Sequence, residues 1–289
     1  MKQMQTDRLT DIKRNIEDTL RWIRESEHIS LNGFGSALGT RIYDASDAKE
    51  LPIQRVTDCS ISLSEYPAME TVIRTSRKYP GETHCFVDCS GILLHDIFDA
   101  PENISDESSA ELLACTTIIS SIGQKRVQDE WENRACKNGG VACVYSPGTT
   151  LLKRGALHLP EPEWVTFDLI ITAPFARDIS GSGSADMPEE SRDKNHPAVR
   201  FLKNIDLALY VAAQRGKKSL IIRLPDPGGA HIGEDYARAA CRIVFLKYLR
   251  YYKRVVAMGS PVKWDQSGMQ SQRLSRDKTE EDNGISGIH

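Results

Sequence analysis

A series of carboxylates follows an apolar stretch in the sequence "FVDCSGILLHDIFDAPENISDE", residues 86–107. The six acidic residues are Asp88, Asp96, Asp99, Glu102, Asp106 and Glu107. Paired carboxylates can divide the roles of general acid and general base in a hydrolysis, and they stabilise a cationic transition state. Three close aspartates could also bind Mg²⁺ or Ca²⁺ through oxygen ligands. A solvated loop is the simplest alternative.

Several of these carboxylates also have a structural interpretation. Ser108 and Glu111 have the spacing of a capping box, and Asp106 would favour the same helix end through the helix dipole. Asp99 and Glu102 flank a proline, as solvated turn residues do. The acidic residues lack the one-three-five spacing of a calcium loop. We therefore expect no bound metal and no cofactor.

The composition is typical of a globular protein with one large domain or two modest ones, with 289 residues, 40% hydrophobic and 27% charged. A net charge of -3 creates no field that would attract nucleic acid or an anionic membrane, so we expect neither as a partner. The sequence shows no leader and no apolar stretch near the ~20 residues that span a bilayer, which predicts a cytoplasmic protein. The seven cysteines include no CxxC pair and are typical of reduced, buried thiols.

Short β-branched stretches alternate with amphipathic helices along the chain. The expected strands are residues 53–63, 83–90, 140–146, 167–173, 218–224 and 253–258. The expected helices are one opening at Thr6 or Asp7, followed by residues 68–79, 108–122, 196–216 and 233–249. This alternation predicts an α/β protein with a mainly parallel sheet covered on both faces. We expect one domain over residues 1–258 and a disordered polar tail over residues 259–289.

Ligands on such sheets bind outside the carboxyl ends of the strands. Four expected strand ends lead into unusual sequence, namely the acidic segment, "PGTTLLKRG", "PFARD" and "PDPGGAHIGED". Gly228 and Gly229 would let backbone amides approach an anion just before a helix start. A tight turn explains the same glycines, so this motif alone leaves both interpretations open.

An ordered series of pieces resembles the bacterial-type poly(ADP-ribose) glycohydrolases, which are macrodomains. The pieces are "VYSPGTTLLKR", "FDLIITAPFA", "AVRFLKNIDLALYVAAQRGKKSLII" and the glycine segment with "EDYARAACRIV" after it. The opening helix, with Arg14, Ile16, Thr19 and Leu20, resembles the N-terminal helix of that family. The resemblance spans residues 8–258 and implies a three-layer α/β/α macrodomain.

The resemblance also implies that ADP-ribose lies at the carboxyl edge of the sheet. Carried over by position, the ligand-binding residues would be Pro174, Phe175, Ala176, Asp226, Pro227, Gly228, Gly229, Ala230 and His231. The glycine segment would line the diphosphate and the distal ribose, and Phe175 would lie near the adenosine, where an aromatic face could stack. A core residue at a strand end is an equally good interpretation of Phe175.

The acidic segment departs from the pattern of that family. There, the matching strand leads into an asparagine, a triple-glycine loop and a Gln-Glu-Glu helix start that supplies the catalytic carboxylate. This chain lacks the triple-glycine loop, and Ala110 and Glu111 fall opposite the two glutamates. Instead, Asp88, Asp96 and Asp106 match three aspartates of a smaller macrodomain group, found among effectors of intracellular bacteria and relatives, that removes ADP-ribose from arginine.

This narrower resemblance implies that Asp96 and Asp106 share acid and base roles and that Asp88 orients the ribose, with Glu111 as a further catalytic candidate. Carboxylates suit a guanidinium leaving group, which they bind through paired hydrogen bonds. The sequence thus predicts a hydrolase that removes mono-ADP-ribose from protein side chains, with arginine preferred. The expected partner is an ADP-ribosylated protein, ADP-ribosylated ubiquitin being one candidate.

Three alternatives stay open. The chain could be a reader that binds ADP-ribose without turnover, because the usual catalytic loop is missing. It could instead be a poly(ADP-ribose) glycohydrolase. The third alternative is an unrelated Rossmann-like nucleotide enzyme or a structural α/β protein.

Overall fold

The computed structural model describes residues 2–26, 35–52, 58–90, 96–99, 107–152, 164–173, 196–224 and 242–258. Within these ranges, the side chains of residues 2–9, 96, 99 and 107 are not described. The predicted tail, residues 259–289, lies outside the described residues. In the part of the chain that is described, no helix combines the length and hydrophobicity needed to cross a bilayer.

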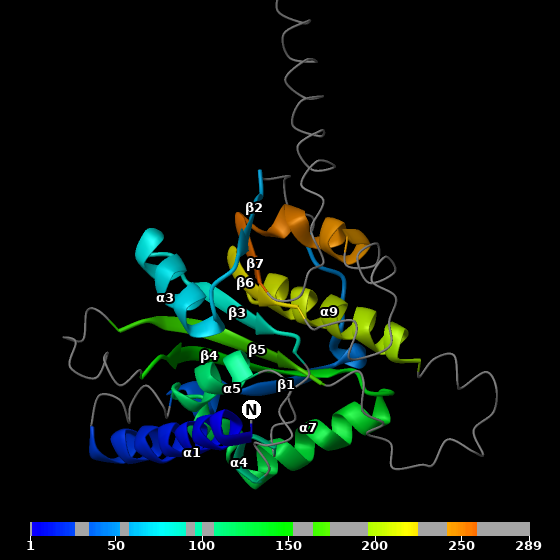
Figure 1. Ribbon diagram of the computed structural model, residues 1–289. Helices are drawn as coiled ribbons and strands as arrows, with labels where there is room; N and C mark the ends of the chain where they lie inside the picture. Colours follow the sequence, from blue (N-terminus) through cyan, green and yellow to red (C-terminus); the bar gives the residue numbers. More distant parts are fainter. Residues whose placement is uncertain are drawn as a thin grey trace, which may run out of the picture.

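A seven-stranded sheet forms the middle layer of the molecule (Figure 1), in the order β1-β4-β5-β3-β6-β7-β2. Its strands are β1 (Arg41–Asp44), β2 (Ser60–Ser64), β3 (His84–Asp88), β4 (Ala142–Thr150), β5 (Thr166–Thr172), β6 (Ser219–Arg223) and β7 (Arg254–Met258). β4 is antiparallel to both of its neighbours, β1 and β5, and every other neighbouring pair is parallel. The predicted α/β class with a mainly parallel mixed sheet is confirmed.

Three strands differ from the sequence prediction. β2 begins at Ser60, although a strand was expected from residue 53; residues 58 and 59 are not in a strand, and residues 53–57 lie outside the described residues. β1 was not predicted, because four residues are too few to show a clear alternation. β4 continues to Thr150 through a shift of register between Ser146 and Thr149, with Gly148 at a φ of 60°. Since β4 is antiparallel, "PGTTLLKRG" does not follow a strand at the carboxyl edge of its parallel neighbours, and that prediction is wrong.

Among the described residues, six helices pack together with one face of the sheet. They are α1 (Lys2–Glu25), α3 (Ala68–Lys78), α4 (Asp96–Asp99), α5 (Glu107–Ala114), α6 (Ile119–Ile122) and α7 (Lys125–Lys137). The opening helix is amphipathic as predicted, since Ile12 and Ile16 are buried in this cluster, although it begins earlier than predicted. Thr19 of α1 also donates a hydrogen bond to the carbonyl of Ala114, at 2.7 Å. This bond joins α1 to the end of α5.

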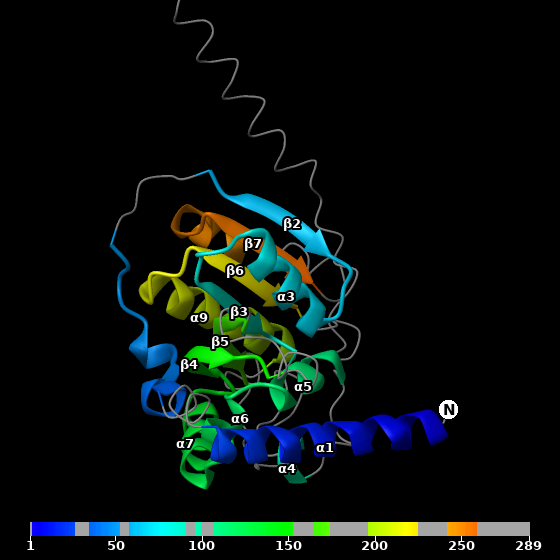
Figure 2. The same cartoon turned by 90° about the vertical axis from the view of Figure 1, so that its left-hand side faces the viewer.

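The second face is covered by α9 (Pro197–Gln214), together with the helix of residues 242–248 and η5 (Leu249–Tyr251). Figure 2 shows α9 on one side of the sheet and α3 and α5 on the other. Pro197 begins α9, and Gly216 follows its end at a φ of 70°, as the sequence predicts. The three-layer arrangement is therefore present in the described residues.

The single helix predicted for residues 108–122 is wrong. α5 ends at Ala114, and the chain then forms an antiparallel bridge between Thr116 and Leu151 before α6 begins. The amide of Thr150 donates to the hydroxyl of Thr117 at 2.9 Å. β-Branched residues and hydroxyls that compete for backbone partners explain the break at "CTTII".

The prediction of buried thiols holds for Cys85, Cys89, Cys115 and Cys143. Cys136 is exposed, which corrects that prediction, and Cys59 is half-buried. Burial raises the pKa of the Cys59 thiol to about 11 and raises the pKa of Cys85 and Cys143 further. These three thiols therefore stay protonated, and weakly reactive, at neutral pH.

His84 should make the stability of the fold depend on pH. It is buried at the start of β3 with its Nδ1 2.8 Å from the Ser219 hydroxyl, and burial lowers the pKa of its imidazole. The imidazole of the unfolded chain takes up a proton below about pH 6.5, whereas that of the folded chain does so only at a lower pH. Stability should therefore be full above this pH and fall below it.

The measurement is urea unfolding at pH 5.5 and at pH 7.5, for the wild type and for His84→Gln. Because glutamine does not titrate, the variant should lose less stability between the two pH values than the wild type does. Equal losses would show that His84 contributes nothing to the pH dependence. The comparison is made within each protein, so any pH-independent effect of the substitution cancels.

Candidate active site

Three neighbouring parallel strands end at one edge of the sheet, where three of the four segments that the sequence singled out begin. β3 lies between β5 and β6 in the sheet, so the carboxyl ends of all three lie side by side. The acidic segment leaves from β3, the segment that begins with Pro174 leaves soon after β5, and the glycine segment leaves soon after β6. The acidic segment therefore starts between the two predicted ligand-binding segments, at the edge where ligands of parallel sheets bind.

Asp88 lies at the centre of this edge and is completely buried, at 0% exposure. Its Oδ1 accepts a hydrogen bond from the backbone amide of Ser90 at 2.8 Å, which fixes the carboxylate against the turn that follows β3. Its carbonyl accepts a hydrogen bond from Thr172 Oγ1 at 3.3 Å. Because side chains alternate along a strand, Asp88 lies on the same face as Phe86, under the layer that contains α5.

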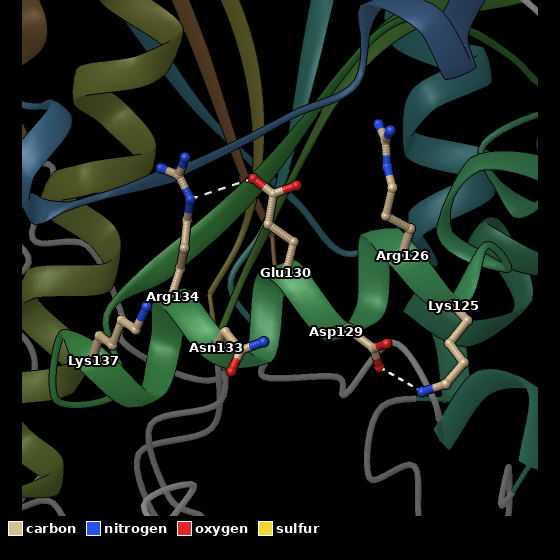
Figure 3. A pocket seen from close by; sticks show the side chains of 7 residues that line it. All are labelled: Lys125, Arg126, Asp129, Glu130, Asn133, Arg134 and Lys137. Atoms are coloured by element: carbon tan, nitrogen blue, oxygen red, sulfur yellow. Dashed lines mark hydrogen bonds and ion pairs between the residues drawn. The ribbon is translucent and has the colours of Figure 1, made fainter.

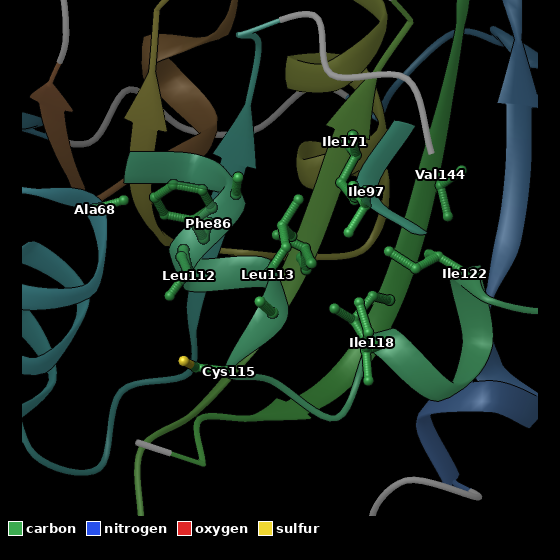
Figure 4. Packing of buried hydrophobic residues seen from close by; sticks show 14 of the residues in the cluster. Ala68, Phe86, Ile97, Leu112, Leu113, Cys115, Ile118, Ile122, Val144 and Ile171 are labelled. Carbon is green, nitrogen blue, oxygen red and sulfur yellow. The ribbon is translucent and has the colours of Figure 1, made fainter. Parts of the chain in front are cut away.

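The backbone of Asp96 lies in the same layer. Asp96 begins α4, and the next residue, Ile97, is completely buried in the cluster that contains Phe86 (Figure 4). Phe98 packs so closely on Gly123 that an added Cβ there would lie 3.0 Å from its ring. These two apolar side chains anchor α4 over the sheet. They place Asp96 on the face to which Asp88 belongs, although the side chain of Asp96 is not described.

The predicted capping box of Ser108 and Glu111 is wrong. α5 begins at Glu107, so Ser108 is already inside the helix. Its hydroxyl accepts a hydrogen bond at 2.8 Å from the amide of Ala68, the first residue of α3, and so supplies one of the acceptors that a helix start lacks. Glu111 is exposed on α5, whereas Ala110 is buried. The catalytic role of Glu111 stays a prediction, and its solvent-exposed position contrasts with the buried position of Asp88.

The other predicted site residues lie outside the described residues. They are Asp106, Pro174, Phe175, Ala176, Asp226, Pro227, Gly228, Gly229, Ala230 and His231. Their roles stay predictions. The described chain does show where their segments attach, because α5 begins directly after Asp106 and β6 ends two residues before Pro225.

Sequence reasoning missed two arginines at this edge. Arg223 ends β6 and is paired in register with Asp88. Arg200, in the first turn of α9, is 7% exposed, and its Cδ would lie 2.7 Å from a Cβ added to Gly140. The pattern of the β6 strand places Arg223 at its end, but only the strand order shows that Asp88 is its neighbour.

A separate hollow of about 760 Å³ runs along α7 (Figure 3). Its lining residues in the described chain are Lys125, Arg126, Asp129, Glu130, Asn133, Arg134 and Lys137. Lys125 is 2.8 Å from Asp129, and Arg134 is 3.0 Å from Asp47, so much of this charge is already paired. Among the residues that the structure describes, no group of three or more His, Cys, Asp or Glu side chains could hold a metal ion.

Solved structures of bacterial poly(ADP-ribose) glycohydrolases have this arrangement of strands and helices. The enzyme from Thermomonospora curvata is 12% identical, with a TM-score of 0.60 over 86% of this chain and 93% of its own. Its complex with the inhibitor ADP-HPD is 14% identical, with a TM-score of 0.59 over 89% and 94%. The enzyme from Deinococcus radiodurans in complex with ADP-ribose is 12% identical, with a TM-score of 0.57 over 83% and 98%.

The chain has the fold of these glycohydrolases. The predicted macrodomain-like α/β architecture is thereby confirmed. No protein-family model and no curated protein matches the sequence. At this level of identity the likeness concerns the backbone alone, so the chemistry must be argued from the residues at the carboxyl edge.

Proposed function

We propose that the chain is a hydrolase that removes mono-ADP-ribose from protein side chains, with arginine-linked ADP-ribose preferred. The observation that carries this proposal is the buried Asp88 between two strands whose ends lead into the predicted ligand-binding segments. Solved structures with this fold include glycohydrolases that hold ADP-ribose or the inhibitor ADP-HPD. That supports ADP-ribose as the ligand of the same edge.

Asp88 suits the stabilisation of positive charge. Cleavage of the ribose C1″–N bond develops oxocarbenium character, and a carboxylate in a water-poor site stabilises such charge more strongly than one in water. In this proposal one of Asp96 and Asp106 takes a proton from the water that attacks C1″. The other helps the departing guanidine nitrogen to receive a proton, which regenerates arginine. The products are ADP-ribose and the unmodified side chain.

The proposed partner is an ADP-ribosylated protein in the cytoplasm, and ADP-ribosylated ubiquitin is one candidate. The charge and composition favour neither nucleic acid nor a membrane as a partner. The modified side chain would approach the carboxyl edge with its guanidinium toward the acidic segment. Six carboxylates between residues 86 and 107 supply the complementary charge.

A reader that binds ADP-ribose without turnover is the second candidate function. The observation in its favour is the orientation of α5, on which Ala110 is buried and Glu111 is exposed. The described part of α5 thus directs no carboxylate toward the sheet. Hydrolysis then depends on the aspartates of the acidic segment, and a reader would result if these did not act on the ribose.

The test is release of ADP-ribose from an arginine-modified protein, a serine- or glutamate-modified protein and poly(ADP-ribose). The wild type should act on the arginine-linked substrate alone, and Asp96→Ala should lower this turnover by about 10²- to 10⁴-fold because a proton-transfer group is removed. Asp99→Ala is the matched control, since Asp99 is the other aspartate of α4, which corrects the turn interpretation, and it has no assigned role in the proposed reaction. It should retain activity.

Each other outcome identifies a different function. ADP-ribose binding without release from any substrate would establish a reader. Release from poly(ADP-ribose) would establish the polymer hydrolase. A chain that neither binds ADP-ribose nor releases it would have to be an unrelated nucleotide enzyme or a structural α/β protein.

A further inference from the structure

We infer that Arg223 binds the diphosphate of the nucleotide and keeps that anion compatible with an acidic site. This inference rests on the proposed function, because it takes a diphosphate-containing nucleotide as the ligand. It concerns a residue at the end of β6 that the sequence did not single out.

The position of Arg223 is set by the pairing of β3 and β6. Asp88 and Arg223 are register partners at the last residues of two neighbouring parallel strands. The amide of Cys89 donates to the carbonyl of Arg223 at 2.9 Å, so the two strands remain paired one residue beyond Asp88. Side chains at paired positions of a parallel sheet lie on the same face. Arg223 therefore lies beside Asp88, on the face that carries Phe86 and Ile221.

The two side chains differ in burial. Asp88 is completely buried, whereas Arg223 is half-buried. The carboxylate is thus shielded from solvent, whereas part of the Arg223 residue on the neighbouring strand is accessible to it. A planar guanidinium with five N–H donors can contact a carboxylate and still present donors to a phosphate.

The surrounding sequence makes a cation necessary at this place. The segment from Phe86 to Glu107 contains six carboxylates and neither lysine nor arginine. The segment from Leu224 to Asp235 contains Asp226 and two more carboxylates, again without lysine or arginine. A diphosphate bound at this edge would lie near the strand ends from which both segments leave, and their net negative charge disfavours an anion there. Arg223 lies at the base of both segments, where it offsets the repulsion.

The experiment measures the affinity of ADP-ribose, AMP and adenosine for the wild type and for Arg223→Gln by isothermal titration calorimetry. ADP-ribose should bind the variant at least about tenfold more weakly, which corresponds to one charge-assisted hydrogen bond. The affinity for AMP should fall less than that for ADP-ribose, and adenosine, which has no phosphate, should bind equally well. Lys218→Gln is the matched control, because Lys218 is exposed next to the other end of β6. It should bind all three as the wild type does.

Arg223→Lys provides a second variant that keeps the charge. It should bind ADP-ribose with an intermediate affinity, because lysine is a point charge without the planar fork. Thermal unfolding of each variant shows whether it is folded, and if Arg223→Gln is not, Arg223→Met, which keeps an apolar stem without the charge, takes its place. Full ADP-ribose affinity of the folded methionine variant would overturn the inference.

The outcomes separate this inference from the proposed function. Unchanged ADP-ribose affinity in folded Arg223→Gln overturns the inference, whether turnover is normal or reduced, and an equal loss for adenosine does the same. If the wild type binds ADP-ribose through Arg223 but hydrolyses no substrate, the inference stands and the hydrolase proposal fails. A wild type that does not bind ADP-ribose overturns both.

Discussion

Replacing Asp88 with asparagine should lower the turnover of arginine-linked ADP-ribose by at least about a hundredfold, while ADP-ribose affinity changes little. Asparagine has the same shape, and its Oδ1 can still accept the hydrogen bond from the Ser90 amide. The substitution removes the negative charge and replaces Oδ2 with an NH2 donor. The charge acts on the transition state and much less on the neutral ribose of the product. Single-turnover kinetics and calorimetric ADP-ribose affinity measure the two effects.

Asp44 provides a closely matched control for this substitution. It also ends a strand, β1, is almost fully buried, and accepts a hydrogen bond from the amide two residues on, Ser46, at 2.8 Å. Asp44 lies at the same edge of the sheet, but β4 and β5 separate it from Asp88 on β3, and it has no assigned role in the proposed reaction. Asp44→Asn should therefore keep full turnover. Equal turnover of Asp88→Asn and the wild type would refute a catalytic role for Asp88.

Replacing Asp168 with alanine should lower the free energy of unfolding by about 3–5 kcal/mol, because the substitution leaves a largely buried cation without its partner. Asp168 is buried at the start of β5, with its Oδ2 2.5 Å from the Lys217 ammonium and its Oδ1 3.1 Å from the amide of Gly148. The hydroxyl of Tyr145 also donates a hydrogen bond to Asp168. Burial, together with this carboxylate, raises the pKa of the Tyr145 phenol. Urea unfolding at pH 7 measures the loss.

The exposed pair of Asp206 and Lys247 is the control for this second prediction. Its side chains also form an aspartate–lysine ion pair, at 2.9 Å, but they are 39% and 58% exposed. Asp206→Ala should change stability by no more than about 1 kcal/mol, as solvent screens the pair. If both substitutions had the same effect, burial would not govern the contribution of Asp168. Because Asp168 lies in the first half of β5, away from the strand end at the candidate site, ADP-ribose affinity of the folded variant should be unchanged.

Local patterns predicted most of the strands and the long helices, because burial on one face leaves a period in the sequence. α7 was missed because only Trp131 and Ala135 of its thirteen residues are buried. The capping box failed for a different reason, since the hydroxyl of Ser108 has its partner in α3, forty residues away. The sequence could not show that Asp88 and Arg223 are neighbours either, because their proximity depends on which strands, distant in the sequence, pair in the sheet.

The order of the sheet also has a consequence for synthesis of the chain. β2 is synthesised early and is one of the two edge strands of the sheet. It pairs with β7, with Ser60 opposite Arg254. A nascent chain on the ribosome cannot complete that side of the sheet until almost the whole described fold has emerged. Until then the edge of β6 that β7 will cover remains unpaired. During this interval the growing polypeptide most needs chaperones to protect it from aggregation.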